Sequence, residues 1–259
     1  MLTCASFFAG VGGIDLGFSK ICKTIYANEF DEKASITFET NFPIKVDQRD
    51  INTVKASELP KFDILLGGFP CQAFSVAGYR EGFKDKKGRG ELFFELARII
   101  KAKKPRVVFL ENVKNLVGHD KGNTFRVILE TLSTLGYHVN YQVLNAMTYG
   151  NVPQNRERIY IVGFRKKSDY KKFKFPLPIP LTTNIHSVIN STDNTPELFY
   201  TAEKYSFYDI LSKEITKEDT VYQWRRKYVR ENKSNVCPTL TANMGTGGHN
   251  VPLIKTPLG

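Results

Sequence analysis

The stretch LTCASFFAGVGG, residues 2–13, joins an apolar run to a glycine-rich turn, and a helical pattern follows it. Glycines between a strand and a helix let a ligand approach the backbone closely. Short apolar runs continue to alternate with helical patterns up to about residue 165, which is typical of a parallel sheet with crossover helices. We therefore predict an α/β fold whose ligands bind outside the carboxyl ends of the strands.

The spacing of apolar residues also predicts where the elements lie. The expected strands are Leu2–Phe8, Lys23–Ala27, Phe62–Leu66, Arg106–Leu110, His138–Leu144 and Ile159–Phe164. The expected helices are Ile14–Ile21, Glu32–Asn41, Glu91–Lys103 and Asn123–Leu135. Beyond them the periodicity weakens, and Pro176, Pro178 and Pro180 interrupt any regular element. We predict two domains, residues 1–175 and a second, less regular module over residues 176–259.

Composition narrows the class of partner. The chain has 259 residues, with 37 Lys or Arg against 26 Asp or Glu and a net charge of +11. This surplus suits a polyanion, because basic side chains that neutralise phosphates release counterions, although a basic surface also serves solubility. We predict no membrane span and no secretory signal. Four scattered cysteines predict neither a disulfide scaffold nor a zinc site, and favour a reducing cytoplasm.

Polar groups at the ends of the first strands indicate a nucleoside ligand. Glu29 can accept both ribose hydroxyls, and Phe30 beside it can stack on adenine. Asp50 and Ile51, at a third strand position, offer a polar group beside an apolar wall. Asp15 stands where the dinucleotide fingerprint has a glycine, which disfavours a nicotinamide cofactor. The sequence therefore predicts a nucleoside ligand without requiring a pyrophosphate.

Cys71 lies in the segment GGFPC, which follows an expected strand. A lone cysteine is commonly a small buried hydrophobe, but a loop at the carboxyl end of a strand suits a nucleophile better. Glu111 ends the next strand, at the same edge of the sheet. Arg156 and Arg158, two residues apart, are expected on one face of a further strand. A solvated loop acid and a surface ion pair are the alternatives for these side chains.

The ordered motifs resemble those of bacterial DNA (cytosine-5)-methyltransferases. The matching segments are FAGVGG (8–13), PCQ (70–72), GRGELFF (88–94), ENV (111–113) and QNRER (154–158). Five motifs in the family's order make a chance match negligible. The resemblance implies a Rossmann-like, S-adenosylmethionine-dependent methyltransferase sheet, with the binding and catalytic domain over residues 1–175. It also implies a smaller, irregular, partial target-recognition module over residues 176–259.

The resemblance assigns roles to individual residues. Cys71 would add to carbon 6 of a flipped-out cytosine, so that carbon 5 takes the methyl group of S-adenosylmethionine and S-adenosylhomocysteine is left. Glu111 would bond to N3 and N4 of the base and protonate N3, and Arg158 with Arg156 would hold the base oxygen and nearby backbone. The implied cofactor-binding residues are Phe8, Gly10, Gly12, Glu29, Phe30, Asp50, Ile51, Gly68, Pro70 and Leu92. The implied DNA-binding residues are Gln72, Ser75, Arg80, Lys87, Arg89, Thr239, Thr241 and Gly247.

Further expectations concern the substrate and the C-terminus. The resemblance implies duplex DNA as substrate, a closing loop over residues 75–90, no metal, and a role in a bacterial restriction–modification system at the nucleoid. An RNA cytosine-5 methyltransferase and an inactive DNA-binding remnant are the alternatives. The sequence stops at Gly259, before two motifs that end the family's pattern. We therefore expect a second polypeptide that carries them, or a truncated gene product, and weak activity from this chain alone.

Overall fold

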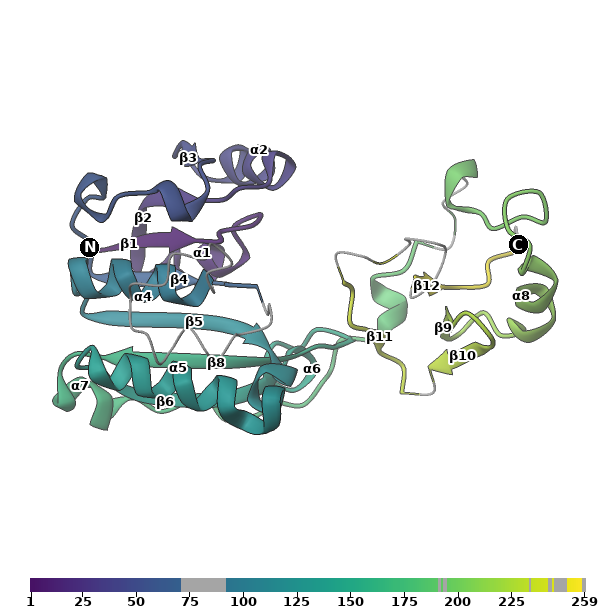
Figure 1. Ribbon diagram of the computed structural model, residues 1–259. Helices are drawn as coiled ribbons and strands as arrows, with labels where there is room; N and C mark the ends of the chain where they lie inside the picture. Colours follow the sequence, from purple (N-terminus) through teal and green to yellow (C-terminus); the bar gives the residue numbers. More distant parts are fainter. Residues whose placement is uncertain are drawn as a thin grey trace. The chain divides into compact units, whose positions relative to one another are not determined.

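A computed structural model describes residues 1–70, 92–190, 192, 195–232, 234–241, 244 and 251–257. Its contacts divide the chain into two units (Figure 1). The first unit holds Met1–Val143 and Arg158–Phe175, and the second holds Leu144–Glu157 and Pro176–Gly259. The sequence predicted a single boundary near residue 175, but residues 144–157 belong to the second unit. A short strand in this segment pairs with a strand at residues 237–238. The spacing of apolar residues does not predict this pairing.

The first unit is built on a sheet with the strand order β3-β2-β1-β4-β5-β8-β6 among the described residues. Its strands are β1 (Leu2–Phe7), β2 (Cys22–Asn28), β3 (Val46–Asp47), β4 (Ile64–Gly67), β5 (Val107–Val113), β6 (His138–Asn145) and β8 (Glu157–Phe164). The chain moves outward from β1 to β3 and then returns to β4 on the other side of β1. The ends of β1 and β4 therefore form the switch point at which sheets of this kind bind ligands.

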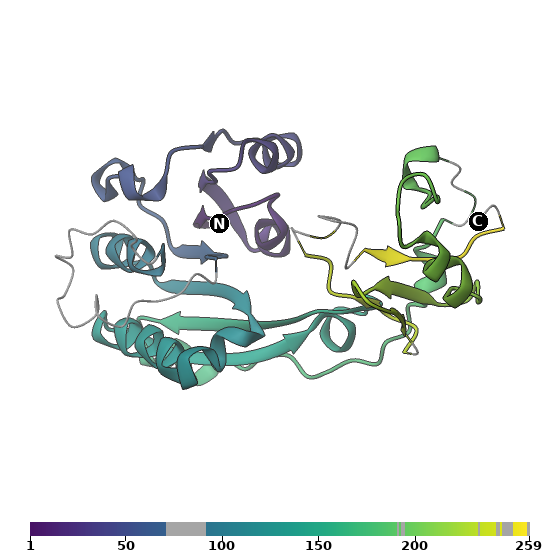
Figure 2. The same cartoon turned by 45° about the vertical axis from the view of Figure 1, so that its right-hand side comes forward.

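Helices cover both faces of this sheet (Figures 1 and 2). They are α1 (Gly13–Phe18), α2 (Glu32–Asn41), α4 (Leu92–Lys103), α5 (Asn123–Thr134) and α7 (Lys167–Lys172), with the single-turn elements η1 (Ile51–Thr53), η2 (Ala56–Glu58), η3 (Lys114–Val117) and η4 (His119–Gly122). Apolar residues three and four apart on α4 and α5 pack on Ala5 and Phe7 of β1. Helix α1 packs on the other face, through Ile14 and Phe18. Because side chains alternate along a strand, β1 serves both cores.

One strand differs from the predicted parallel sheet. Strand β8 pairs antiparallel with β5 over the whole of both strands, while β1, β2, β3, β4 and β5 pair in parallel. Residues 146–156, which join β6 to β8, hold a single-turn helix, whereas a parallel return needs a crossover of about a dozen residues or more. The predicted parallel sheet is therefore confirmed from β3 to β5, and β8 is an antiparallel strand that the sequence analysis did not foresee.

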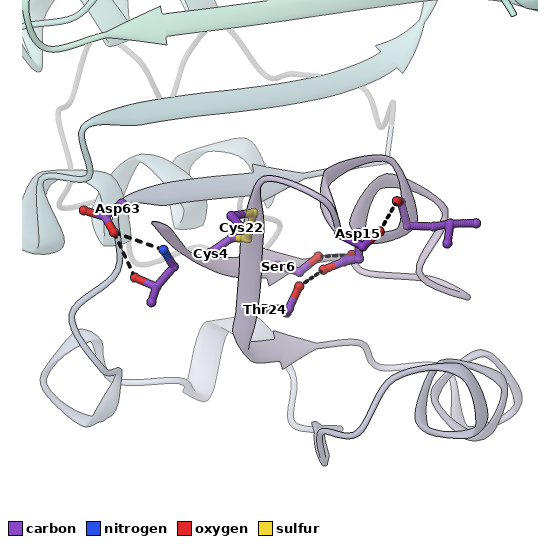
Figure 3. The surroundings of a disulfide bond; sticks show 9 residues. Cys4, Ser6, Asp15, Cys22, Thr24 and Asp63 are labelled. Atoms are coloured by element: carbon purple, nitrogen blue, oxygen red, sulfur yellow. Dashed lines mark hydrogen bonds between the residues drawn. A yellow bond between two sulfur atoms is a disulfide. The ribbon is translucent and has the colours of Figure 1, made fainter. Parts of the chain in front are cut away.

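Cys4 and Cys22 form a disulfide bond on the α1 face of the sheet (Figure 3). The sequence predicted no disulfide scaffold, and it did not reveal this single bond. Eighteen residues separate the two cysteines in sequence, but parallel pairing sets Leu2 opposite Cys22 and Cys4 opposite Thr24. Only the register of two strands brings them together, and cysteine spacing does not reveal it. Among the described residues, Cys237 is the free cysteine.

The second unit has its own small core beneath a three-stranded antiparallel sheet. Its elements are α6 (Ala146–Tyr149), β7 (Gln154–Asn155), η5 (Ile185–Ser187), η6 (Pro196–Leu198), α8 (Tyr208–Glu214), β9 (Val221–Trp224), β10 (Val229–Asn232), β11 (Cys237–Pro238) and β12 (Pro252–Leu253). Tyr222 and Trp224 of β9 pack with Leu211 of α8 and Leu253 of β12. The indole of Trp224 stacks on Phe207 with ring centroids 4.7 Å apart. Within the described part of the chain, no helix is long and apolar enough to cross a membrane.

Candidate active site

The turn that follows β1, residues 8–13, exposes its backbone at the switch point. Phe8, Gly10 and Gly12 have φ angles of 53°, 54° and 89°, in the left-handed region that favours glycine. A Cβ at Gly12 would lie 2.3 Å from the ring of Phe42, so glycine is required there. A Cβ at Gly10 would meet no atom of the described residues within 4 Å. The space beside Gly10 is therefore open to a ligand.

Glu29 joins the end of β2 to this turn. Its Oε2 accepts a hydrogen bond from the backbone N–H of Gly10 at 2.8 Å, and its Oε1 accepts one from Asp31 at 2.9 Å. A carboxylate has about four lone-pair sites, so each oxygen can still accept a hydroxyl. Phe30, the next residue, has 75% of its surface exposed. An open glycine cradle, a carboxylate with spare acceptor capacity and an exposed ring fit the adenosine part of S-adenosylmethionine.

Asp50 and Ile51 do not lie on a strand, and this prediction is wrong. Strand β3 ends at Asp47, and Asp50 instead caps η1 by accepting hydrogen bonds from the backbone and side chain of Asn52 at 2.9 and 2.8 Å. A short aspartate side chain that bonds two residues onward favours a turn over a strand. Ile51 is 3% exposed and belongs to the core beneath α4. Leu92, the first residue of α4, packs on the same core.

The end of β4 lies beside both the glycine turn and Glu111. A Cβ added at Gly68 would lie 3.5 Å from the carbonyl oxygen of Phe8 and 3.8 Å from Oε2 of Glu111. Pro70, two residues on, is exposed. Cys71 lies three residues beyond Gly68, and three extended residues span at most about 11 Å. The strand that leads to Cys71 therefore ends at the edge where the carboxylate and the turn meet.

Several predicted residues fall outside the described part of the chain. They are Cys71, Gln72, Ser75, Arg80, Lys87, Arg89 and Gly247. Their roles as nucleophile and DNA contacts stay predictions.

Glu111 and Arg158 form an ion pair across neighbouring strands. Oε1 of Glu111 lies 2.9 Å from Nε of Arg158, and their side chains are 21% and 14% exposed. The register of β5 and β8 sets Glu111 opposite Tyr160 and Arg158 opposite Val113, so the ion pair is diagonal. A guanidinium and a carboxylate held side by side at low exposure present both donors and acceptors. This pair can hold the polar edge of a planar base.

Asn112 is a candidate that sequence reasoning did not single out. It is 3% exposed, and its Nδ2 donates a hydrogen bond to the carbonyl oxygen of Phe69 at 2.8 Å. Its Oδ1 accepts a bond from the backbone of Val113 at 2.8 Å. Val108, Leu110 and Asn112 lie on the same face of β5, and all three are buried. A polar amide in line with two apolar residues was the signal in the sequence. Asn112 therefore fixes the backbone two residues before Cys71.

Arg156 and Arg158 do not share one strand face, contrary to the prediction. Arg156 lies between β7 and β8 and belongs to the second unit, whereas Arg158 belongs to the first. Nη1 of Arg156 donates to the carbonyl oxygen of Leu240 at 3.3 Å. Near it, the hydroxyl of Thr239 donates to the carbonyl oxygen of Asn155 at 2.6 Å, and Thr241 is exposed. Arg156 therefore lies outside β8, and its guanidinium bonds within the second unit.

A polar hollow lies within the second unit. It is lined by Asn155, Gln223, Arg230, Asn232, Ser234, Val236, Pro238 and Thr239. Gln223 of β9 stands opposite Arg230 of β10, on the face of the sheet turned away from the core residues Tyr222 and Trp224. Arg230 is exposed and contributes the cation of this lining. The signal that sequence reasoning missed was one polar residue, Gln223, inside the apolar run Val221–Trp224.

Comparisons with known proteins agree with this architecture. A family model described as C-5 cytosine-specific DNA methylase matches residues 2–256. Type II methyltransferase M.Bsp6I of Bacillus sp. (strain RFL6) is 62% identical over the whole chain and 83% of its own length. Type II methyltransferase M.HhaI of Haemophilus parahaemolyticus is 45% identical over 70% of the chain, which spans 55% of that protein. A DNMT2 structure from Spodoptera frugiperda shares the fold, with a TM-score of 0.64 and 19% identity over 81% of this chain and 66% of that one.

Proposed function

The chain belongs to the C-5 cytosine-specific DNA methylase family, and we propose that it methylates flipped-out cytosine in duplex DNA through a covalent adduct of Cys71. It is a DNA (cytosine-5)-methyltransferase of the type found in restriction–modification systems, and it uses S-adenosylmethionine. The assignment of residues rests on one observation. Gly68, at the strand end that leads to Cys71, lies beside both Glu111 and the turn of residues 8–13.

The proposed chemistry begins at the cysteine. The thiolate of Cys71 adds to carbon 6 of cytosine, which makes carbon 5 nucleophilic. S-Adenosylmethionine supplies the electrophilic methyl group that carbon 5 takes. Loss of the proton from carbon 5 then expels Cys71 and restores the aromatic ring. Glu111 forms hydrogen bonds with N3 and N4 of the base and protonates N3, which stabilises the negative charge that thiolate addition creates. Arg158 orients Glu111 and donates a hydrogen bond to the base oxygen.

The proposed cofactor site lies on the other side of the switch point. Gly10 and Gly12 supply a backbone that the cofactor can approach, Glu29 accepts its ribose hydroxyls, and Phe30 stacks on adenine. Phe8, Gly68, Pro70 and Leu92 complete the walls. Asp50 and Ile51 act indirectly in this arrangement, because Asp50 caps η1 and Ile51 is buried in the core. No metal takes part in the proposed reaction.

The second unit is the proposed target-recognition module. Thr239, Thr241 and Arg230 are its proposed DNA contacts among the described residues, with Gly247 outside them. The hollow around Arg230 combines one cation with amides and hydroxyls that both donate and accept. The edge of a base carries both donors and acceptors, whereas phosphate oxygens only accept hydrogen bonds. Such a mixture therefore matches a base edge better than a phosphate. We place Arg156 in this module, beside Leu240.

Two further expectations stay proposals. A second polypeptide that supplies the family's last motifs is tested by adding those motifs, as a separate chain or as an extension, and measuring methylation. Use in a bacterial cytoplasm, at the nucleoid, is part of the same proposal. The match to a DNA methylase family favours DNA over RNA as the substrate.

The direct test of the function is transfer of a tritiated methyl group from S-adenosylmethionine. Duplex DNA of mixed sequence, transfer RNA and duplex DNA without cytosine are compared, and the product nucleoside is identified by chromatography. When the two motifs that end the family's pattern, here called the closing motifs, are supplied to the chain, we expect 5-methylcytosine in DNA. We expect none with Cys71→Ala. Label in transfer RNA alone would move the assignment to RNA, and no label in either polymer would support the DNA-binding remnant.

A further inference from the structure

Asp15 is a buried carboxyl group that the proposed reaction does not use. It lies in the first turn of α1, directly after the turn of residues 8–13, and is 1% exposed. Burial raises the pKa of Asp15, and hydrogen bonds from Ser6 and Thr24 act in the opposite direction. Burial of a carboxyl group lowers the stability of a fold unless its hydrogen bonds compensate. A buried carboxyl group beside the proposed cofactor-binding turn therefore indicates a functional role.

The contacts of Asp15 reach two strands (Figure 3). The hydroxyl of Ser6 on β1 donates to Oδ2 at 2.7 Å, and the hydroxyl of Thr24 on β2 donates to Oδ1 at 2.8 Å. One carboxyl group on α1 therefore joins both strands whose carboxyl ends carry the proposed cofactor groups. Ser6 lies two residues before Phe8, and Thr24 lies five residues before Glu29.

The turn between β1 and α1 needs such an anchor. Three of its residues, Phe8, Gly10 and Gly12, have left-handed backbone angles, and its glycines add conformational freedom in the unfolded chain. At its start, Gly10 is tied to β2 by Glu29. At its end, α1 is short, and Asp15 ties it to β1 and β2. Both ends of the turn are thus tied to β2 or to Glu29, the residue that follows it.

We propose that Asp15 is a positioning residue for cofactor binding: through Ser6 and Thr24 it sets the distance between the residue 8–13 turn and Glu29. It touches neither the cofactor nor the base. The proposal rests on the proposed function, since it assumes that the turn and Glu29 bind S-adenosylmethionine. An apolar residue of similar size at position 15 would fill the same space without fixing α1 to both strands.

The test is calorimetric titration of S-adenosylhomocysteine into folded variants of the full chain. We expect Asp15→Ala to raise the Kd about tenfold, which corresponds to about 1.4 kcal/mol. Asp15→Asn should retain more affinity than Asp15→Ala, because its Oδ1 can accept from one hydroxyl while its Nδ2 donates to the other. In turnover assays with the closing motifs added, the KM for S-adenosylmethionine should rise while kcat changes little.

Asp63, directly before β4, provides a matched control because it also bonds to a residue of β1. Its Oδ2 accepts hydrogen bonds from the backbone and hydroxyl of Thr3, at 3.0 and 3.2 Å, at the opposite end of β1 (Figure 3). Asp63→Ala should lower the melting temperature and leave the Kd at the wild-type value. Thr24→Val keeps the side-chain shape and removes one donor, so it replaces Asp15→Ala if that variant does not fold, and it should weaken binding as well.

The outcomes separate this inference from the proposed function. If the wild-type chain binds S-adenosylhomocysteine and folded Asp15→Ala or Thr24→Val binds it equally well, the positioning role is wrong and the function stands. If the wild-type chain does not bind it, the proposed cofactor site fails and the role of Asp15 fails with it. Equal weakening by Asp63→Ala would mean that general loss of stability, and not positioning, lowers the affinity.

Discussion

The side chain of Asn112 holds the carbonyl oxygen of Phe69 at 2.8 Å, and both residues are almost fully buried. Asn112 follows Glu111 on β5, and Phe69 lies after the end of β4, two residues before Cys71 in the sequence. One hydrogen bond therefore links the strand of the proposed acid to the loop of the proposed nucleophile. Because Pro70 is the only residue between Phe69 and Cys71 in the sequence, we expect a shift at Phe69 to move the thiol.

Removal of this hydrogen bond should slow the covalent step. Asn112→Ala leaves the buried carbonyl of Phe69 without this donor, so we expect a loss of about 1–3 kcal/mol in unfolding free energy. The rate of adduct formation should fall about 10–100-fold, since small misplacements of a reacting group carry costs of this size. Asn115→Ala, an exposed amide three residues on, should change neither quantity. Wild-type adduct rates in a folded Asn112→Ala protein would contradict the assignment.

The ion pair between Glu111 and Arg158 should matter for turnover more than for stability. Arg158→Ala removes a guanidinium that lies 2.9 Å from Glu111, and we expect kcat to fall about 100-fold or more, as for loss of a charge-stabilising donor. Arg158→Lys keeps the charge but loses the planar fork, so it should recover only part of the rate.

The control is an exposed ion pair on a helix. Arg126 and Glu130 lie 2.7 Å apart on α5, with side chains 56% and 42% exposed. Arg126→Ala should leave kcat unchanged and lower stability by at most about 0.5 kcal/mol. Equal kcat values for Arg158→Ala and Arg126→Ala would rule out a role for Arg158 in the reaction.

Arg230 should affect sequence preference. If it reads a base edge, Arg230→Ala relaxes the preference at one position of the site, at a cost of about 1–3 kcal/mol. Arg230→Lys should relax the same preference while it preserves the dependence of log Kd on log salt. A phosphate contact gives the opposite result: Arg230→Ala then weakens binding to every sequence alike and reduces the salt slope by about one. Binding to a library of duplexes at several salt concentrations distinguishes the two.

Acid should destabilise the first unit through Asp47. Hydrogen bonds from Arg49, and then from Tyr26, lower the pKa of Asp47 from 3.8 to about 2. Because the folded value lies below the unfolded one, ionised Asp47 stabilises the fold above pH 3.8, and this stabilisation is lost as the pH falls toward about 2. Denaturant unfolding between pH 5 and 2 should show a weaker pH dependence for Asp47→Asn than for the wild type. Parallel curves would show that this group is not the one titrating.

Much of the first unit could be predicted because its elements are local and periodic. Helix α2 spans Glu32–Asn41 as predicted, and strands β1 and β6 differ from the prediction by one residue at one end. These segments owe their structure to alternating or helical spacing of apolar residues, which a sequence displays directly. The α/β class followed from the same spacing, whereas the ordered motifs were identified by their residues and by their resemblance to the family.

The differences depend on contacts between distant segments. The pairing of Cys4 with Cys22 follows from the register of two strands, and the break at Arg156 follows from pairing of β7 with β11, more than 80 residues away. Asp50 is the exception, because it differs from the prediction for a local reason: its side chain caps a turn by bonding to Asn52, two residues on. The partners of Asn112 and Asp15 are backbone and hydroxyl groups on other strands, whose positions no residue spacing encodes.

The central claim is that Cys71 forms a covalent bond to cytosine beside Glu111 and Arg158. Duplex DNA with 5-fluorocytosine tests it, because fluorine at carbon 5 cannot leave as a proton and the adduct is trapped. With S-adenosylmethionine and the closing motifs supplied, we expect a denaturation-resistant complex of protein and DNA, absent for Cys71→Ala and much reduced for Arg158→Ala. A complex that forms equally with Cys71→Ala, or no complex from the wild type under these conditions, would contradict the account.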